Sequence, residues 1–370
     1  MKDFLKKISS SGNVAVYEIE PRSKIKRFVI TSSATRRILN APEIHGFEYI
    51  YFLRKGIESF FKSSYGKKHF GGMDDSGITV LHFLRGGLNF GFVELLYKCF
   101  GFKKVNSSFM TSQRFQKGKR WMIKQDQYRK FALEGVNTII AGDVIATGTT
   151  LKNGFDCLLK LAGSSLENFI FFTIGTPYTE KIIERYFDIF KKRNAKFQAS
   201  IFYIEGRFSL VESKDEYPLC IPGTDLVKKN ALLTPEFELS QTVSSVLERC
   251  EIYDVGARAF NWRVHFRDLI EYWEGLASRE WTLLDVYNMR WPFPYNDYNS
   301  FRNIKRELWP GIREAFLKKL YERELKRIKY AITLDSWEFL SEHLKFLKNI
   351  YAGGKITKRA KEAGCLIMKK

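Results

Sequence analysis

The sequence is poor in the residues that build disulfide frameworks and zinc sites. Its 370 residues include five cysteines and five histidines, and the cysteines show no Cys-x-x-Cys spacing. This pattern argues against a disulfide-stapled secreted domain and against a zinc site. No apolar run is long enough to span a bilayer, and residues 1–7 lack the apolar core of a signal peptide. We therefore expect a cytoplasmic protein that has no membrane partner.

Acidic residues are also in short supply. The chain has 61 Lys and Arg residues against 41 Asp and Glu residues, a formal net charge of +20. Such an excess favours polyanionic or phosphorylated partners. The basic residues are densest in residues 101–130. Charge alone fits either a solvated basic surface or a nucleic-acid-binding patch in this stretch. Nucleic acid therefore stays a candidate partner, bound through basic surfaces.

Aromatic residues are abundant, with 32 Phe and 18 Tyr, so the chain can form a sizeable core. Apolar runs bounded by turn residues predict strands, and the segments between them have helical periodicity. Strands alternating with helices imply an α/β fold, with a parallel sheet flanked by helices on both faces. Ligands in such sheets bind at the carboxyl ends of the strands. The predicted strands are 78–84, 104–110, 137–141, 168–174 and 197–204; the predicted helices are 88–100, 150–161 and 177–194.

The stretch from residue 138 to residue 151 carries the strongest functional pattern. An apolar strand ends at Gly142-Asp143, and a turn rich in Gly and Thr leads into a helix. Unpaired N–H groups at the helix start, Thr hydroxyls and close backbone approach at Gly148 would form a phosphate cradle. Asp143 would accept hydrogen bonds from sugar hydroxyls or help to hold a divalent cation. The alternative is an ordinary strand-to-helix connection with Thr as the helix N-cap.

This stretch resembles the signature of type I phosphoribosyltransferases, which bind 5-phosphoribosyl-1-diphosphate (PRPP). Asp143 matches the second of the family's two acidic positions, whereas Gly142 stands at the first. Leu84-Arg85-Gly86-Gly87 is similar to the family's pyrophosphate loop, and both loops look most like those of uracil-type members. The resemblance covers about residues 75–210. It implies that the 5-phosphate binds to Ala146, Thr147, Gly148, Thr149 and Thr150, and the diphosphate to Arg85, Gly86 and Gly87.

The sequence also predicts a domain organisation. Residues 1–44 would form an N-terminal arm, and 45–240 a phosphoribosyltransferase-like domain that includes a hood segment. Residues 241–370 would form a mainly helical C-terminal domain with a basic tail. Residues 110–125 take the place of the family's flexible loop, with Arg114, Lys117 and Lys119 as candidate diphosphate contacts. In the hood, Thr224 and Asp225 are candidate acceptor contacts, although Asp225 also suits a turn cap.

The implied activity is transfer of the 5-phosphoribosyl group from PRPP to a nitrogen acceptor, with release of diphosphate. Arg85 and Asp143 are the candidate catalytic residues, and Mg²⁺ is the expected cofactor, with Asp143 as its one candidate protein ligand. Gly142, where a carboxylate is usual, motivates an alternative. The chain would then be a regulatory or effector protein that binds a nucleotide or ribose phosphate without turnover. The resemblance also leaves a homodimer as an alternative to a monomer, because core enzymes of this fold often form dimers.

Overall fold

The computed structural model describes residues 2–117, 120–125, 128–214, 217, 219–278, 281–290, 297–333 and 336–353, and between 113 and 125 it describes the backbone alone. Ten strands of these residues form one mixed sheet. Its centre is parallel, in the order β3 (Lys26–Ser32), β11 (Gln198–Leu210), β10 (Asn168–Gly175), β9 (Thr138–Ile145), β4 (Ile78–Leu84) and β5 (Asn106–Thr111). The five strands expected from the sequence all lie in this centre.

The expectation of a parallel sheet needs correction at the edges. Antiparallel strands extend the sheet beyond β3 and β5 and along β11. The first 44 residues, expected as an arm, supply three strands and pair with β11 through β3. The antiparallel strands are β1 (Phe4–Ser11), β2 (Val14–Glu20), β8 (Arg129–Lys130) and β12 (Leu226–Leu233); β6 (Gln113–Lys117) and β7 (Arg120–Gln125) form a separate ribbon.

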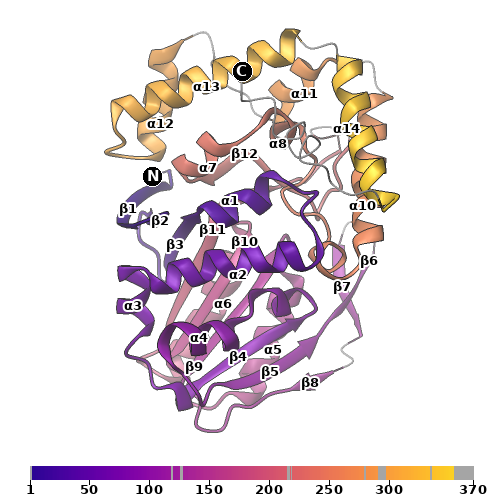
Figure 1. Ribbon diagram of the computed structural model, residues 1–370. Coiled ribbons are helices and arrows are strands. Elements are labelled where there is room, and N and C mark those ends of the chain that lie inside the picture. Colours follow the sequence, from indigo (N-terminus) through magenta and orange to yellow (C-terminus); the bar gives the residue numbers. More distant parts are fainter. Residues whose placement is uncertain are drawn as a thin grey trace.

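Helices cover both faces of the sheet (Figure 1). Successive strand residues point to opposite faces, so Ile140 and Phe172 pack in one apolar cluster while Ile139 and Phe171 pack in another. This double burial explains why the strands are almost continuously apolar. One face carries α1 (Ser33–Asn40), α2 (Gly46–Lys62), α3 (Ser64–Phe70) and α4 (Phe92–Phe100); the other carries α5 (Thr149–Leu161) and α6 (Tyr178–Arg193).

The C-terminal third is helical, as expected, and it shares its core with the rest of the chain. Arg258 is buried, and its guanidinium donates to Ile44 O at 2.7 Å, Ile38 O at 2.8 Å and Ala41 O at 2.9 Å. The helices are α7 (Pro235–Ser240), α8 (Val243–Leu247), α9 (Val255–Phe260), α10 (Trp262–Ala277), α11 (Leu283–Arg290), α12 (Tyr298–Leu308), α13 (Glu314–Thr333) and α14 (Ser336–Tyr351). The boundaries at 44 and 240 stay predictions.

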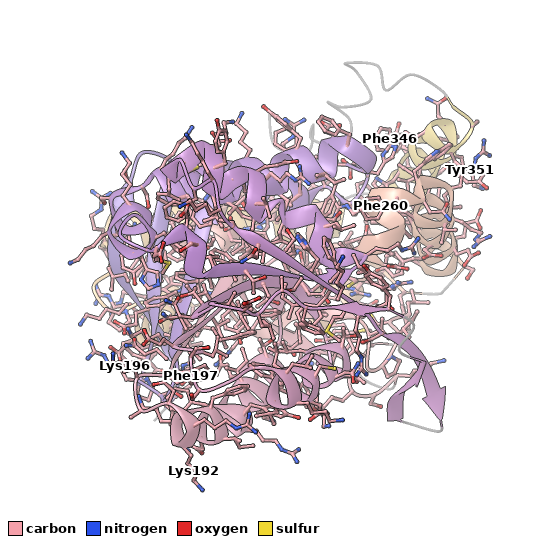
Figure 2. The ribbon with its side chains drawn as sticks, turned by 90° about the horizontal axis from the view of Figure 1, so that it is seen from below. Lys192, Lys196, Phe197, Phe260, Phe346 and Tyr351 are labelled. Atoms are coloured by element: carbon pink, nitrogen blue, oxygen red, sulfur yellow. The ribbon has the colours of Figure 1, made fainter. Side chains whose placement is uncertain are left out.

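The two ends of the molecule differ in what they expose. Figure 2 shows Phe260 of α9 on the same side as Phe346 and Tyr351 of α14, while Lys192 and Lys196 project from the opposite side.

Among the described helices, none combines the length and the apolar composition that a bilayer crossing needs. The cytoplasmic location, the nucleic-acid partner and the homodimer stay predictions.

Candidate functional site

A cavity of about 420 Å³ lies where the ends of β4 and β9 meet the hood segment and the helical third. This volume suits a small phosphorylated ligand, since ligand pockets usually measure about 300–1,000 Å³. The carboxyl ends of parallel strands were expected to converge on one site, and the cavity lies at that edge. From the predicted set, its lining includes Arg85, Gly86, Asp143, Ala146, Gly148, Thr149, Thr150 and Thr224.

Gly87, Thr147 and Asp225 lie outside this lining. Gly87 is buried behind the turn, where an added Cβ would be 3.0 Å from Gly142 O. Thr147 places its Oγ1 3.1 Å from Thr149 Oγ1. Of the flexible-loop candidates, Arg114 and Lys117 are residues of β6, where the structure describes the backbone alone. Lys119 lies outside the described residues.

The start of α5 has the backbone geometry of an anion site. Gly148 is the N-cap residue, with a left-handed φ of 76°, and no side chain caps the helix. The first intrahelical bond runs from Lys152 N to Gly148 O at 2.9 Å, so the N–H groups of residues 149–151 precede it. A Cβ at Gly148 would overlap Ile182 Cδ1. The alternative of a Thr N-cap is therefore wrong, and the helix start keeps donors for an anion.

The turn after β4 touches the acidic tip of β9. The Leu84–Arg85 peptide is cis, and residues 86–90 form a 3₁₀ turn, η2 (Gly86–Phe90). A Cβ at Gly86 would be 2.5 Å from Asp143 Oδ1, so glycine lets the backbone lie against this carboxylate. Asp143 Oδ1 also accepts the Val144 N–H at 2.8 Å. The predicted pyrophosphate turn and the predicted ribose contact are thus direct neighbours.

Aromatic packing leaves little room for a side chain at position 142. A Cβ at this position would be 2.8 Å from Phe90 Cδ1 and 2.9 Å from Phe92 Cε2. The two rings are stacked with their centroids 5.4 Å apart, and both are buried. Distances under 3.0 Å leave no room for a side chain. The end of β9 therefore carries one carboxylate, that of Asp143, because the rings of Phe90 and Phe92 fill the space beside Gly142.

The hood contributes Thr224 to the cavity and uses Asp225 for structure. Asp225 is buried, accepts the Ile221 N–H at 3.0 Å, and forms an ion pair with Arg249 Nε at 2.8 Å. Burial raises the pKa of Asp225, and the Arg249 charge opposes that rise. The interpretation of Asp225 as a turn residue therefore fits the geometry better than an acceptor contact.

Sequence reasoning missed the residues that the helical third brings to the cavity. Those with polar or aromatic side chains are Arg249, Tyr253, Asp254 and Asp268. Asp254 is the N-cap of α9 and its Oδ1 accepts the Gly256 N–H at 2.9 Å. An Asp two residues before a glycine at a helix start is a capping signal, and it does not distinguish a ligand site from an ordinary helix.

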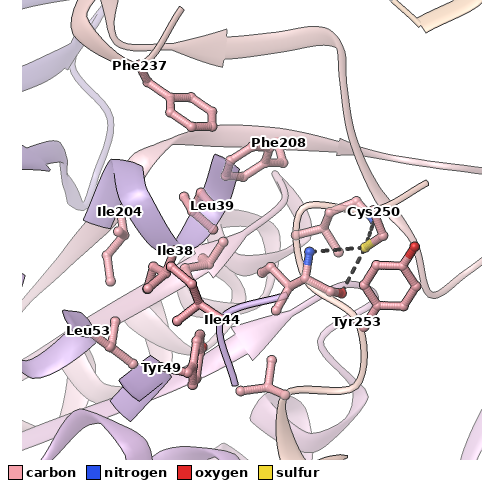
Figure 3. Packing of buried hydrophobic residues seen from close by; sticks show 14 of the residues in the cluster. Ile38, Leu39, Ile44, Tyr49, Leu53, Ile204, Phe208, Phe237, Cys250 and Tyr253 are labelled. Carbon is pink, nitrogen blue, oxygen red and sulfur yellow. Dashed lines mark hydrogen bonds between the residues drawn. The ribbon is translucent and has the colours of Figure 1, made fainter. Parts of the chain in front are cut away.

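Close packing holds this part of the lining in place. Figure 3 shows Cys250 and Tyr253 beside Ile38 and Ile44. The Cys250 thiol is hydrogen-bonded to the backbone of residue 252. The same segment reaches the turn after β4, because a Cβ at Gly256 would be 3.4 Å from Arg85 Nη2 and 3.1 Å from Asp254 Oδ1. Arg85, in the turn after β4, therefore lies next to the start of α9 in the helical third.

Comparisons with known proteins give a distant likeness. No family model matches the chain, and no curated protein does. A hypoxanthine phosphoribosyltransferase from Staphylococcus aureus is 16% identical, with 46% of this chain and 74% of that chain covered and a TM-score of 0.24. A hypothetical protein from Neisseria gonorrhoeae with bound ppGpp is 10% identical, with 35% and 69% covered and a TM-score of 0.23. At such scores neither likeness carries an argument about activity.

Proposed function

We propose that the cavity binds PRPP and that the protein transfers its 5-phosphoribosyl group to a nitrogen acceptor, releasing diphosphate. One observation carries the proposal: Arg85 and Gly86, Asp143, and the start of α5 at residues 148–150 line a single cavity. These are the chemical groups that a ribose with phosphates at both ends requires. The resemblance of the same turns to those of type I phosphoribosyltransferases supports the assignment.

Each end of PRPP has a matching group. The 5-phosphate would accept hydrogen bonds from the N–H groups at the start of α5 and from the hydroxyls of Thr149 and Thr150. The diphosphate would lie against Arg85 and the backbone of Gly86. Asp143 lies between these two turns, in contact with Gly86, and would accept hydrogen bonds from the ribose hydroxyls.

The side chains fit a magnesium ion that arrives with the diphosphate. Among the described residues, no group of three or more His, Cys, Asp or Glu side chains could hold a metal by itself. Mg²⁺ is commonly held by one or two carboxylates together with substrate phosphates and water, and Asp143 offers one carboxylate at the turn. When bound, the ion would neutralise charge on the departing diphosphate.

The reaction follows from where charge develops. The bond from ribose C1 to the diphosphate oxygen breaks, and the electron pair leaves with diphosphate. A lone pair of the acceptor nitrogen forms the new bond to C1, and that nitrogen loses its proton. Arg85 stabilises the leaving charge, and Asp143 faces the positive ring. Positioning of the two substrates in the cavity supplies much of the rate.

The test measures diphosphate release from PRPP with Mg²⁺ and a panel of nitrogen acceptors. Asp143→Asn should lower the rate at least about tenfold, somewhat below the roughly 10²–10⁴-fold that one positioned acid–base group supplies. Asp188→Asn is the matched control, because Asp188 is exposed on α6 and pairs with Lys24. An unchanged rate in Asp143→Asn would remove Asp143 from the mechanism. Failure of the wild-type protein to bind PRPP in calorimetry would overturn the proposal.

A second function is favoured by the packing at Gly142. Phe90 and Phe92 exclude a second carboxylate at the end of β9, which leaves Asp143 alone to orient the ribose. A site with this composition could bind a nucleotide or ribose phosphate as a regulatory or effector protein without turnover. Calorimetry would then show binding of the phosphorylated ligand, while diphosphate release stays at background with every acceptor. Turnover with any acceptor would exclude this second function.

A further inference from the structure

The helical third adds carboxylates to the cavity that the proposed transfer does not use. Asp254 at the start of α9 and Asp268 on α10 both line it. Burial raises the pKa of Asp268; the charges of Glu271 and Asp254 add to that rise, whereas those of Arg249 and Arg267 oppose it. This part of the wall therefore carries two carboxylates within an otherwise basic protein.

The neighbouring cation does not cancel this charge fully. Arg249 also lines the cavity, but its Nε forms the 2.8 Å ion pair with buried Asp225. Asp268 is half-buried and has no hydrogen-bond or ion-pair partner in the part of the chain that the structure describes. Asp254 uses one oxygen for the Gly256 N–H. The carboxylates of Asp254 and Asp268 thus remain able to accept hydrogen bonds from a ligand.

The chemistry of this wall restricts the ligand. An ionised carboxylate accepts hydrogen bonds and donates none, so a group that faces it needs N–H donors and should carry no negative charge. Ile252 and Val255 lie beside these carboxylates in the lining, and their apolar surface suits the face of a planar ring. Arg85 lies next to Gly256, which brings this wall to the turn where the diphosphate is proposed to bind.

We propose that the helical third recognises the acceptor, and that the acceptor is an uncharged nitrogen heterocycle carrying an amino group, such as adenine, guanine or cytosine. The proposal rests on the transferase or nucleotide-binding site described above and names its ligand class. Acidic heterocycles such as orotate would be repelled by Asp254 and Asp268. Uracil has no amino group, and the carbonyl oxygens on both sides of its N3–H would face the acceptor oxygens of the wall.

Binding of nucleoside 5′-monophosphates tests this specificity without requiring turnover. In calorimetry, AMP, GMP or CMP should bind at least about tenfold more tightly than UMP and orotidine 5′-monophosphate, because a site built for hydrogen bonds discriminates strongly against ligands that lack the matching groups. Asp268→Asn should remove most of this preference, since the amide replaces one acceptor oxygen with a donor.

Two further variants make the result decisive. Asp188→Asn removes an exposed carboxylate on α6, outside the lining, and should keep the wild-type preference. Asp254→Asn keeps a good helix cap and should weaken the preference as Asp268→Asn does, which protects the test if one variant folds poorly. If the wild-type protein binds PRPP but binds all five monophosphates with equal affinity, or binds none of them, this inference is overturned and the proposed function is not. Absence of PRPP binding in wild type would instead overturn the proposed function.

Discussion

Replacing Gly142 tests whether aromatic packing, rather than ligand chemistry, dictates the residue at the end of β9. A Cβ at position 142 would lie 2.8 Å from Phe90 Cδ1, 2.9 Å from Phe90 Cγ and 2.9 Å from Phe92 Cε2. Both rings are buried, with 1% of each residue exposed, so neither can move into solvent without opening the core. Gly142→Ala should therefore destabilise the protein, and Gly142→Asp should do so more strongly.

The size of the effect follows from two opposing contributions. Inserting atoms into a well-packed core costs about 1–3 kcal/mol. Replacing glycine by alanine returns about 0.4–1 kcal/mol by restricting the unfolded chain. Gly142→Ala should then lower the free energy of unfolding by about 1–2 kcal/mol. Gly142→Asp adds the cost of a buried carboxylate, which is at least about 1–3 kcal/mol more when the group lacks partners.

Urea unfolding of matched variants measures this difference. Gly163→Ala is the control, because a Cβ at exposed Gly163 meets nothing within 4 Å, and its stability should equal or exceed that of wild type. Phe90→Leu should relieve part of the cost in the Gly142→Ala background, since it shortens the obstructing side chain. Equal stability of the Gly142→Ala and Gly163→Ala variants would refute the packing argument. Faster diphosphate release in Gly142→Asp would refute it as well.

Two further outcomes test how the helical third is attached. Arg258→Met should lower the free energy of unfolding by about 3 kcal/mol or more, because three backbone carbonyls lose their buried donor; exposed Arg263→Met is the control in urea unfolding. Burial, assisted by the Arg258 charge, lowers the pKa of His265 to about 3. Its stabilising contribution is present above about pH 6.5 and is lost as the pH falls, by about 1.4 kcal/mol per pH unit. His265→Gln, measured at several pH values, should flatten that dependence.

The central strands could be predicted because each is a short apolar run that ends at turn residues. Ile78–Leu84 matches its predicted bounds, and Thr138–Ile145 starts within one residue of prediction. The strands of the first 32 residues were missed for a different reason. Lys26–Ser32 enters the sheet by pairing with residues 200–204, and no local pattern reveals a partner so distant along the chain.

The candidate site divides in the same way. The turns at 85–86 and 146–150 follow strands directly, so their sequence order implied a common edge of the sheet. Asp254 and Asp268 reach that edge because the helical third is fixed to the loop after α1, where Arg258 donates to Ala41 O and Ile44 O. These contacts depend on long-range folding. The part of the cavity wall that the helical third supplies was therefore not visible in the sequence.

The carboxylates of the cavity have a consistent distribution. At the end of β9, Phe90 and Phe92 leave room for Asp143 but not for a second acid at Gly142. The helical third supplies Asp254 and Asp268 to the same cavity. Negative charge is thus sparse at the strand end, where the ribose is proposed to bind, and denser at the wall proposed for the acceptor. A ligand that joins a phosphorylated ribose to a base rich in N–H donors matches both parts of the cavity.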